Sequence, residues 1–151
     1  MVLENISPKK NIIVAGVGNL MRGDDGVGIY TVKKLKKKGF KQVYNCQTTP
    51  ENYLSKICRN SPDLVLFIDA VELGKTPGYI DIKKAKEVSA GFTTHNSGLD
   101  LVAEFIQNDC GADIYVIAVQ PEKLEGNMSE EVKTAGDKIA SILEEKLCMN
   151  R

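Results

Sequence analysis

Short apolar runs alternate along the chain with segments in which apolar residues recur every three or four positions. A short continuous apolar run is typical of a strand buried on both faces, and the wider spacing is typical of a helix with one buried side. The runs predict strands at 12–17, 40–46, 64–68 and 113–119. The spacing predicts a helix from Asp24 or Asp25 to Lys38, and further helices at 50–59, 97–108 and 130–147. This alternation is typical of a parallel sheet with connecting helices.

One short segment departs from this alternation. Residues 79–82 alternate apolar and polar side chains and follow the third strand without an intervening helix, which predicts an antiparallel or edge strand. The fold class is therefore α/β, a three-layer α/β/α sandwich with a mainly parallel, about five-stranded twisted sheet. We predict a single domain over residues 1–151, with 1–10 and 148–151 as flexible ends and a long loop at 83–96.

Two adjacent acids stand in a glycine-rich turn, Gly16 to Gly28, directly after the first strand. Glycine permits positive φ values and allows a ligand to approach the backbone closely. On a purely structural interpretation, the same residues close a strand-to-helix turn with an aspartate as the helix N-cap. We assign Asp24 to the cap and Asp25 to a ligand, and a shift of one residue in the helix start would exchange these roles. The residues expected to support the turn are Gly16, Gly18, Asn19, Asp24 and Gly26.

Further polar groups are expected at the edge of the sheet where its parallel strands end. Asp69 ends the third strand, residues 120–122 follow the fifth, and His95 lies in the long loop. Taken alone, Asp69 fits a carboxylate that caps backbone N–H groups, and His95 fits an exposed loop residue. Together with Asp25 they form a mixed oxygen and nitrogen set that can hold a divalent transition metal ion and leave coordination positions open.

Composition and charge exclude several classes of function. Basic and acidic residues number 20 each, so the net charge gives no reason to expect a nucleic acid or an anionic membrane as partner. No apolar segment has the length of a signal peptide or a membrane span, and we expect a cytoplasmic protein without membrane insertion. The cysteines lie far apart with no C-x-x-C pair, which argues against a zinc ribbon or a thioredoxin-type site and favours free, mostly buried thiols.

The glycine turn does not match the common nucleotide-binding motifs. Met21 stands where the dinucleotide motif G-x-G-x-x-G needs its third glycine. A P-loop would need Gly-Lys-Ser/Thr where this chain has Met21, Arg22 and Gly23. A domain that binds phosphate or another small ligand at the turn remains an alternative, with Arg22 as its supporting residue.

Three segments resemble the signature segments of the [NiFe]-hydrogenase maturation endopeptidases: Gly16–Gly28, Phe67–Val71 and Thr94–Leu99. The similarity extends in order and spacing from about residue 11 to residue 147. The resemblance implies an enzyme that removes a C-terminal peptide from the large-subunit precursor of a nickel-iron hydrogenase after nickel has been inserted. It also implies that the metal-contacting and catalytic residues are Asp25, Asp69 and His95.

The resemblance further implies that nickel arrives with the precursor, so no tightly bound cofactor is expected in the free protein. Many members have Glu where this chain has Asp25, and Asp25 together with residues 49–52 resembles the subgroup that serves hydrogen-evolving or energy-converting hydrogenases. Either the metal or a carboxylate could activate the peptide bond or the attacking water, and a dyad of Asp25 and Asp69 is a further route. The alternative function is a non-catalytic nickel-binding module for hydrogenase assembly.

Overall fold

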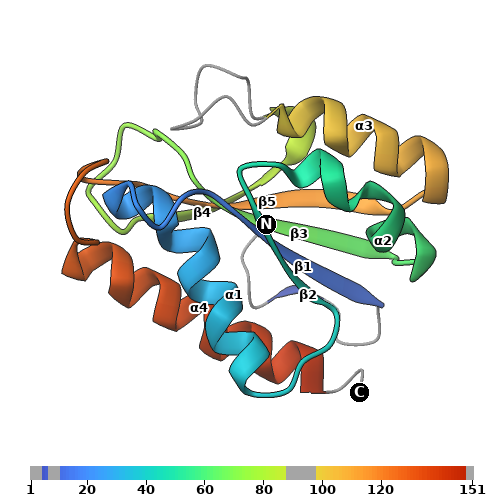
Figure 1. The fold of residues 1–151 in the computed structure, drawn as a ribbon, viewed down its shortest axis with the longest axis horizontal. Helices are drawn as coiled ribbons and strands as arrows, with labels where there is room; N and C mark the ends of the chain where they lie inside the picture. Colours follow the sequence, from blue (N-terminus) through green and yellow to red (C-terminus); the bar gives the residue numbers. More distant parts are fainter. Residues whose placement is uncertain (1–4, 7–10, 88–97, 149–151) are drawn as a thin grey trace.

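A five-stranded sheet forms the centre of the molecule (Figure 1). The computed structural model describes residues 5–6, 11–87 and 98–148. The strands are β1 (Ile12–Val17), β2 (Val43–Gln47), β3 (Leu64–Ala70), β4 (Ile80–Lys84) and β5 (Asp113–Val119). They lie in the order β2-β1-β3-β5-β4, with β4 antiparallel to β5 and the other pairs parallel. The predicted mainly parallel sheet and its antiparallel edge strand are confirmed.

Helices in the described part of the chain cover both faces of this sheet (Figure 1). One face carries α1 (Val27–Lys37) and α4 (Glu130–Cys148), and the other carries α2 (Leu54–Arg59) and α3 (Leu99–Cys110). Short 3₁₀ turns precede α1 and α2 and follow β4, namely η2 (Gly23–Gly26), η3 (Pro50–Tyr53) and η4 (Ala85–Glu87). None of the described helices is long and apolar enough to cross a membrane. The arrangement confirms the predicted three-layer sandwich.

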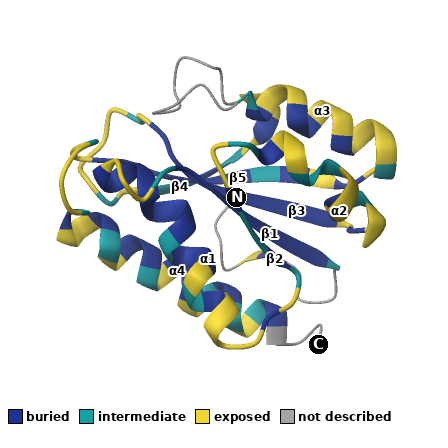
Figure 2. Ribbon diagram, in the orientation of Figure 1, coloured by how far each residue is buried: buried dark blue, intermediate teal, exposed yellow. Residues whose placement is uncertain are grey.

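Alternate residues of the central strands supply two separate cores. In β1, Ile12 and Val14 pack with α1 and α4, whereas Ile13 and Ala15 pack with α2 and α3, as the two-residue period of a strand requires. Figure 2 shows the central strands in dark blue and much of the outer helix surfaces in yellow. Burial on both faces is the reason why these strands are continuous apolar runs in the sequence.

Several element boundaries differ from the prediction, and for three of them the contacts show the reason. β2 begins at Val43 and not at residue 40, because the buried Phe40 still belongs to the turn after α1, where its N–H donates to the Leu35 carbonyl at 3.4 Å. α1 begins at Val27, because residues 23–26 form the 3₁₀ turn η2. β3 continues to residue 70, because its pairing with β5 extends that far, and Asp69 therefore lies inside the strand.

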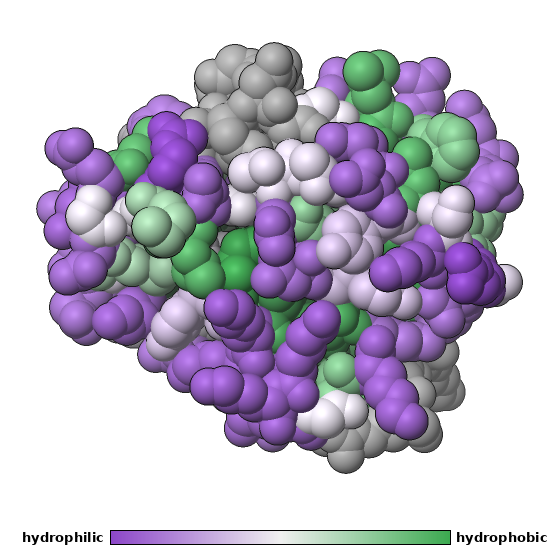
Figure 3. Space-filling model, in the orientation of Figure 1, coloured by the Kyte–Doolittle hydropathy of each residue, from purple (hydrophilic) through white to green (hydrophobic). Residues whose placement is uncertain are grey.

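The spacing of the apolar residues in helix α3 predicts that Leu99, Val102, Phe105 and Ile106 all face inward, but the buried stripe is narrower. Leu99, Val102 and Ile106 are buried as expected, but Phe105 is 50% exposed. The buried residues follow the i, i+3, i+7 spacing of one helix face. Phe105 lies four residues after the exposed Leu101, so these two side chains share the outer face. Figure 3 shows apolar side chains at the surface over α3.

The predicted loop and flexible ends are only partly described. Residues 83–84 belong to β4 and residues 85–87 form η4, whereas 88–96 lie outside the described residues. Ile6, in the predicted N-terminal end, is 3% exposed and packs into the core beneath α1 and α4. Residues 1–4, 7–10 and 149–151 also lie outside the described part of the chain.

Candidate active site

A tight turn after β1 folds its two acidic residues back toward the strand. Gly18 has a φ of 141°, and a Cβ atom there would lie 2.0 Å from the main-chain oxygen of Asp25. A Cβ atom on Gly26 would lie 2.8 Å from the Cα atom of Leu20. A real Cβ atom cannot lie this close to another atom, so only glycine fits at these two positions. The protein's own backbone fills the space that these two glycines leave, which explains why glycine stands there.

Asp25 is buried within this turn, with 0% of its surface exposed. Its Oδ2 accepts a hydrogen bond from the N–H of Asn19 at 3.1 Å, and the same N–H lies 3.3 Å from the Asp25 carbonyl oxygen. The side-chain oxygen of Asn19 accepts a hydrogen bond from the N–H of Met21 at 2.9 Å. The backbone of the turn therefore fixes the Asp25 carboxylate just beyond the end of β1.

Asp69 lies on the neighbouring strand, close to Asp25. The pairing of Gly16 with Ile68 places the ends of β1 and β3 side by side. Asp69 is 0% exposed, and its pKa is raised well above the ordinary 3.8, first by burial and then by the negative charge of Asp25. A hydrogen bond from the backbone of Ala70 acts in the opposite direction. The fold thus brings two of the predicted site residues into electrostatic contact inside the protein.

The third predicted residue, His95, lies outside the described residues. Asp69 stands two positions after Phe67, which places it on the face of the sheet that α2 and α3 cover. Within residues 5–6, 11–87 and 98–148, no group of three or more His, Cys, Asp or Glu side chains is placed to hold a metal ion. Asp25 and Asp69 are therefore the described part of the predicted ligand set.

Two buried carboxylates in electrostatic contact can perform limited kinds of chemistry. Each disfavours ionisation of the other, and burial weakens the stabilisation of both charges by water. A proton on one carboxyl group relieves the repulsion and leaves an acid beside a base. A divalent cation also relieves the repulsion, and carboxylate oxygens are suitable ligands for such a cation. The pair is therefore suited to proton transfer or to the binding of a cation.

Asp24 anchors a loop that comes from the other end of the chain. Its Oδ2 accepts hydrogen bonds from the N–H groups of Glu122 at 2.7 Å and Lys123 at 3.0 Å, and from the Ser129 hydroxyl at 2.9 Å. Its Oδ1 accepts one from the Ser129 N–H at 2.7 Å. Burial alone would raise the pKa of Asp24, but these hydrogen bonds lower it below the ordinary 3.8.

This anchoring corrects the predicted role of Asp24. The N-cap position of α1 is Gly26, and neither η2 nor α1 has a side-chain hydrogen bond at its cap. Asp24 instead holds the segment that leads into α4. No local pattern in the sequence indicates this role, because the partners of Asp24 lie about a hundred positions away along the chain.

Comparison with known proteins identifies the family. The family model described as hydrogenase maturation protease matches residues 29–146. The chain belongs to this family. It is 34% identical to the hydrogenase 3 maturation protease of Escherichia coli K12, over 70% of each chain.

Solved structures of maturation proteases have the same fold. The crystal structure of a [NiFe] hydrogenase maturation protease HycI from Thermococcus kodakarensis KOD1 is 33% identical, with a TM-score of 0.88 over 98% of this chain and 99% of that one. The solution structure of the endopeptidase HycI from Escherichia coli is 27% identical, with a TM-score of 0.78 over 87% of each chain. These similarities confirm the predicted family and the predicted enzyme class, a hydrolase that acts on peptide bonds.

In this maturation protease, Gln120 connects two segments that follow β3 and β5, at the end of the sheet where Asp69 lies. The sequence placed Gln120 after β5 but did not indicate its contacts. Its Oε1 accepts hydrogen bonds from the N–H groups of Leu73 at 2.6 Å and Lys75 at 3.2 Å, and its Nε2 donates to Glu72 at 2.9 Å. The side chain therefore ties the segment after β5 to the segment that follows Asp69. A polar residue directly after a buried apolar strand was the available signal.

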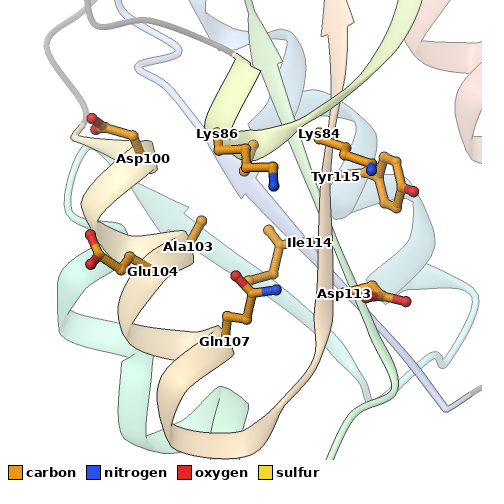
Figure 4. Close-up of a pocket in the computed structure, with 10 residues that line it drawn as sticks. Lys84, Lys86, Asp100, Ala103, Glu104, Gln107, Asp113, Ile114 and Tyr115 are labelled. Carbon is orange, nitrogen blue, oxygen red and sulfur yellow. The ribbon is translucent and has the colours of Figure 1, made fainter.

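A groove of about 420 Å³ lies on another part of the protease, between α3 and the ends of β4 and β5 (Figure 4). Lys84 and Lys86 lie opposite Asp100 and Glu104 of α3 in this view. The other lining residues are Ala85, Ala103, Gln107, Asp113, Ile114 and Tyr115. Neither carboxylate of the candidate site lines the groove, and its side chains of both charges favour no one class of ligand.

Proposed function

We propose that this maturation protease is an endopeptidase that removes a C-terminal peptide from the nickel-loaded large-subunit precursor of a [NiFe]-hydrogenase. The observation that carries the proposal is the buried electrostatic contact between Asp25 and Asp69 at the ends of adjacent parallel strands. The Escherichia coli relative named as a hydrogenase 3 maturation protease supports the class of substrate.

Nickel held by the precursor is, in this proposal, the element that the protease recognises. Two carboxylates and an imidazole, from Asp25, Asp69 and His95, are a donor set that suits a divalent first-row transition metal. The negative charge at the buried pair favours the approach of a cation, and a bound cation offsets the burial and repulsion that raise the pKa of Asp69. A precursor without nickel would gain none of these ligand bonds, so metal insertion would have to precede cleavage.

The protein's own residues divide the proton chemistry between them. Burial and the charge of Asp25 raise the pKa of Asp69, so Asp69 favours the protonated form. Asp25, oriented by the Asn19 N–H, is then the carboxylate available to accept a proton from an attacking water. The nickel that the precursor brings offers a second route, since a bound cation can polarise the scissile carbonyl.

The proposal is tested by incubating the purified protein with large-subunit precursor prepared with and without nickel. Mass spectrometry of the products is expected to show loss of a C-terminal peptide from the nickel-loaded precursor alone. Equal cleavage of both precursors would overturn the role of nickel. Binding of the loaded precursor without any cleavage would instead support the assembly-module alternative.

Two substitutions test the assigned residues. Asp25→Asn and Asp69→Asn each remove an ionisable carboxyl group with little change in volume, and each is expected to lower the cleavage rate at least about 100-fold, as loss of an acid or base does. Asp81→Asn is the matched control, because Asp81 lies on the edge strand β4 and its Oδ1 accepts a hydrogen bond from Ile82. Cleavage by Asp25→Asn at the wild-type rate would contradict the assignment.

A further inference from the structure

Two cysteine thiols that the candidate site does not use lie in direct contact. Cys58 belongs to α2, and Cys110 is the last residue of α3. The Cys110 thiol donates a hydrogen bond to the Cys58 sulfur, with the two Sγ atoms 3.0 Å apart. The Cys110 sulfur also lies 3.3 Å from the carbonyl oxygen of Ile106, its other acceptor. Both cysteines are free and only partly buried, so small oxidants can reach the pair.

The two cysteines lie near the first residues of strands β3 and β5, whereas the carboxylates lie near the other ends of the strands. Cys58 comes shortly before the start of β3, and Cys110 comes shortly before the start of β5. The first residues of these strands, Leu64 and Asp113, are paired in the sheet. Asp69 stands near the other end of β3, five residues after Leu64 and thus about 17 Å further along the extended strand. A bond between the two sulfurs therefore does not touch the candidate active site.

We propose that Cys58 and Cys110 are a modification site at which a low-molecular-weight disulfide, such as oxidised glutathione, forms an intramolecular disulfide that joins α2 to α3. One protein thiolate attacks the small disulfide, which gives a mixed disulfide and releases one molecule of the small thiol. The second protein thiolate then attacks the mixed disulfide, forms the internal bond and releases a second molecule. The two protein sulfurs are oxidised by two electrons in total, the small disulfide is reduced, and the two protons leave with the released thiols.

Geometry favours the internal bond over a lasting mixed disulfide. The second thiol is already in contact with the first, so it competes with free small thiol at a very high local concentration. A covalent S–S bond is about 2.05 Å long, so the sulfurs need to approach by only about 1 Å. Rotation about the side-chain bonds of two partly buried residues at helix C-termini supplies such a movement without disturbing the sheet.

The chemistry of Cys58 argues against a catalytic cysteine and for slow thiol–disulfide exchange. Burial, followed by hydrogen bonds with Cys110 and Asp109, raises the pKa of the Cys58 thiol to about 12. The thiol form therefore predominates at neutral pH, and such a sulfur is a poor catalyst. A pair of this kind keeps its protons in a reducing compartment and is converted only where a disulfide oxidant is in excess.

The disulfide would tie the short helix α2 to the longer helix α3. α2 has six residues, all of them described, and Ile57 is the one buried side chain among them. The bond would close a loop of more than fifty residues between two helices on the same face, and this restricts the unfolded chain. We expect the melting temperature of the oxidised protein to be about 10 °C above that of the reduced protein.

The test uses the full chain with Cys148→Ser, so that Cys148 cannot contribute. This protein is incubated with oxidised glutathione in excess over reduced glutathione, and its intact mass, its peptides without reduction and its melting temperature are measured. The expected result is a loss of about two mass units, a linked pair of peptides that contain Cys58 and Cys110, and the rise in melting temperature. Stable glutathione adducts, or a link through Cys46, would overturn the proposal.

Two variants make the assignment specific. Cys58→Ser and Cys110→Ser, each in the same background, are expected to abolish both the linked peptides and the increase in melting temperature on oxidation. Cys46→Ala is the matched control and should keep both, because Cys46 is buried in β2, outside the proposed pair. An unchanged melting temperature in a protein whose mass proves the disulfide would refute the stabilising role.

Discussion

Asp24 is expected to contribute more to stability than any exposed acid on the surface. Asp24→Asn keeps the shape of the side chain and one acceptor oxygen. If the amide oxygen takes the place of Oδ2, the bonds from Glu122, Lys123 and the Ser129 hydroxyl remain, but they lose the negative charge. The amide nitrogen then faces the Ser129 N–H across 2.7 Å, donor against donor.

The cost follows from these contacts. One charge-assisted hydrogen bond is lost, a buried N–H is left unpaired, and three bonds are weakened. At about 1 to 3 kcal/mol for an unpaired buried group, with a smaller loss for the neutralised bonds, the total is about 3 kcal/mol. This is a large part of the roughly 5–15 kcal/mol that stabilises a typical domain. For a chain of this size it corresponds to a fall of about 10 °C in the melting temperature.

The assay is urea unfolding followed by circular dichroism, from neutral to acidic pH. The pKa of Asp24 is lower in the folded protein than the ordinary 3.8 of an unfolded chain. Its ionised carboxylate therefore stabilises the fold fully above the unfolded pKa, and this contribution is lost as the pH falls through the folded pKa. The difference between wild type and Asp24→Asn should be constant near neutrality and should shrink below about pH 4.

Asp137→Asn is the control for this experiment. Asp137 accepts a hydrogen bond from Tyr30 and pairs with Lys34, but its side chain is 45% exposed, so solvent screens its charge. The control is expected to shift the unfolding midpoint much less than Asp24→Asn. A difference below about 0.5 kcal/mol between wild type and Asp24→Asn at neutral pH would refute the argument.

Two further predictions concern the turn and a buried thiol. Gly18→Ala should destabilise the fold by more than about 3 kcal/mol in urea unfolding, because the new Cβ would lie 2.0 Å from the Asp25 carbonyl oxygen. The control Gly74→Ala, whose Cβ would have nothing within 4 Å, should cost about 1 kcal/mol from the positive φ alone. Equal costs for the two variants would contradict this argument. Cys46, which is buried with a pKa raised to about 12 by burial, should resist alkylation by iodoacetamide at pH 8 in the native protein and react after unfolding. Rapid native alkylation of Cys46, detected by mass spectrometry, would show that this part of the core is open.

The sequence by itself determined the layers of the fold. Side chains face the same side every two residues in a strand and about every 3.6 residues in a helix. These local periods explain the apolar runs of β1, β3 and β5 and the spacing of apolar residues in α1 and α4. The same local reasoning found Asp69, because a carboxylate within an apolar run needs an explanation. It also placed Asp25 and Asp69 at one edge, since parallel strands end on the same side of a sheet.

Tertiary structure alone decided the contacts of several other side chains, both polar and apolar. The N-cap is the ordinary role for an aspartate before a helix, yet Asp24 binds Ser129, which is 105 positions away. The contact between Cys58 and Cys110 spans 52 positions, and no local pattern indicates it. Phe105 fits an apolar stripe by spacing, but the width of the stripe depends on how closely α3 lies against the sheet. Periodicity reports only on neighbours along the chain, whereas these three outcomes depend on which distant surfaces meet when the layers pack.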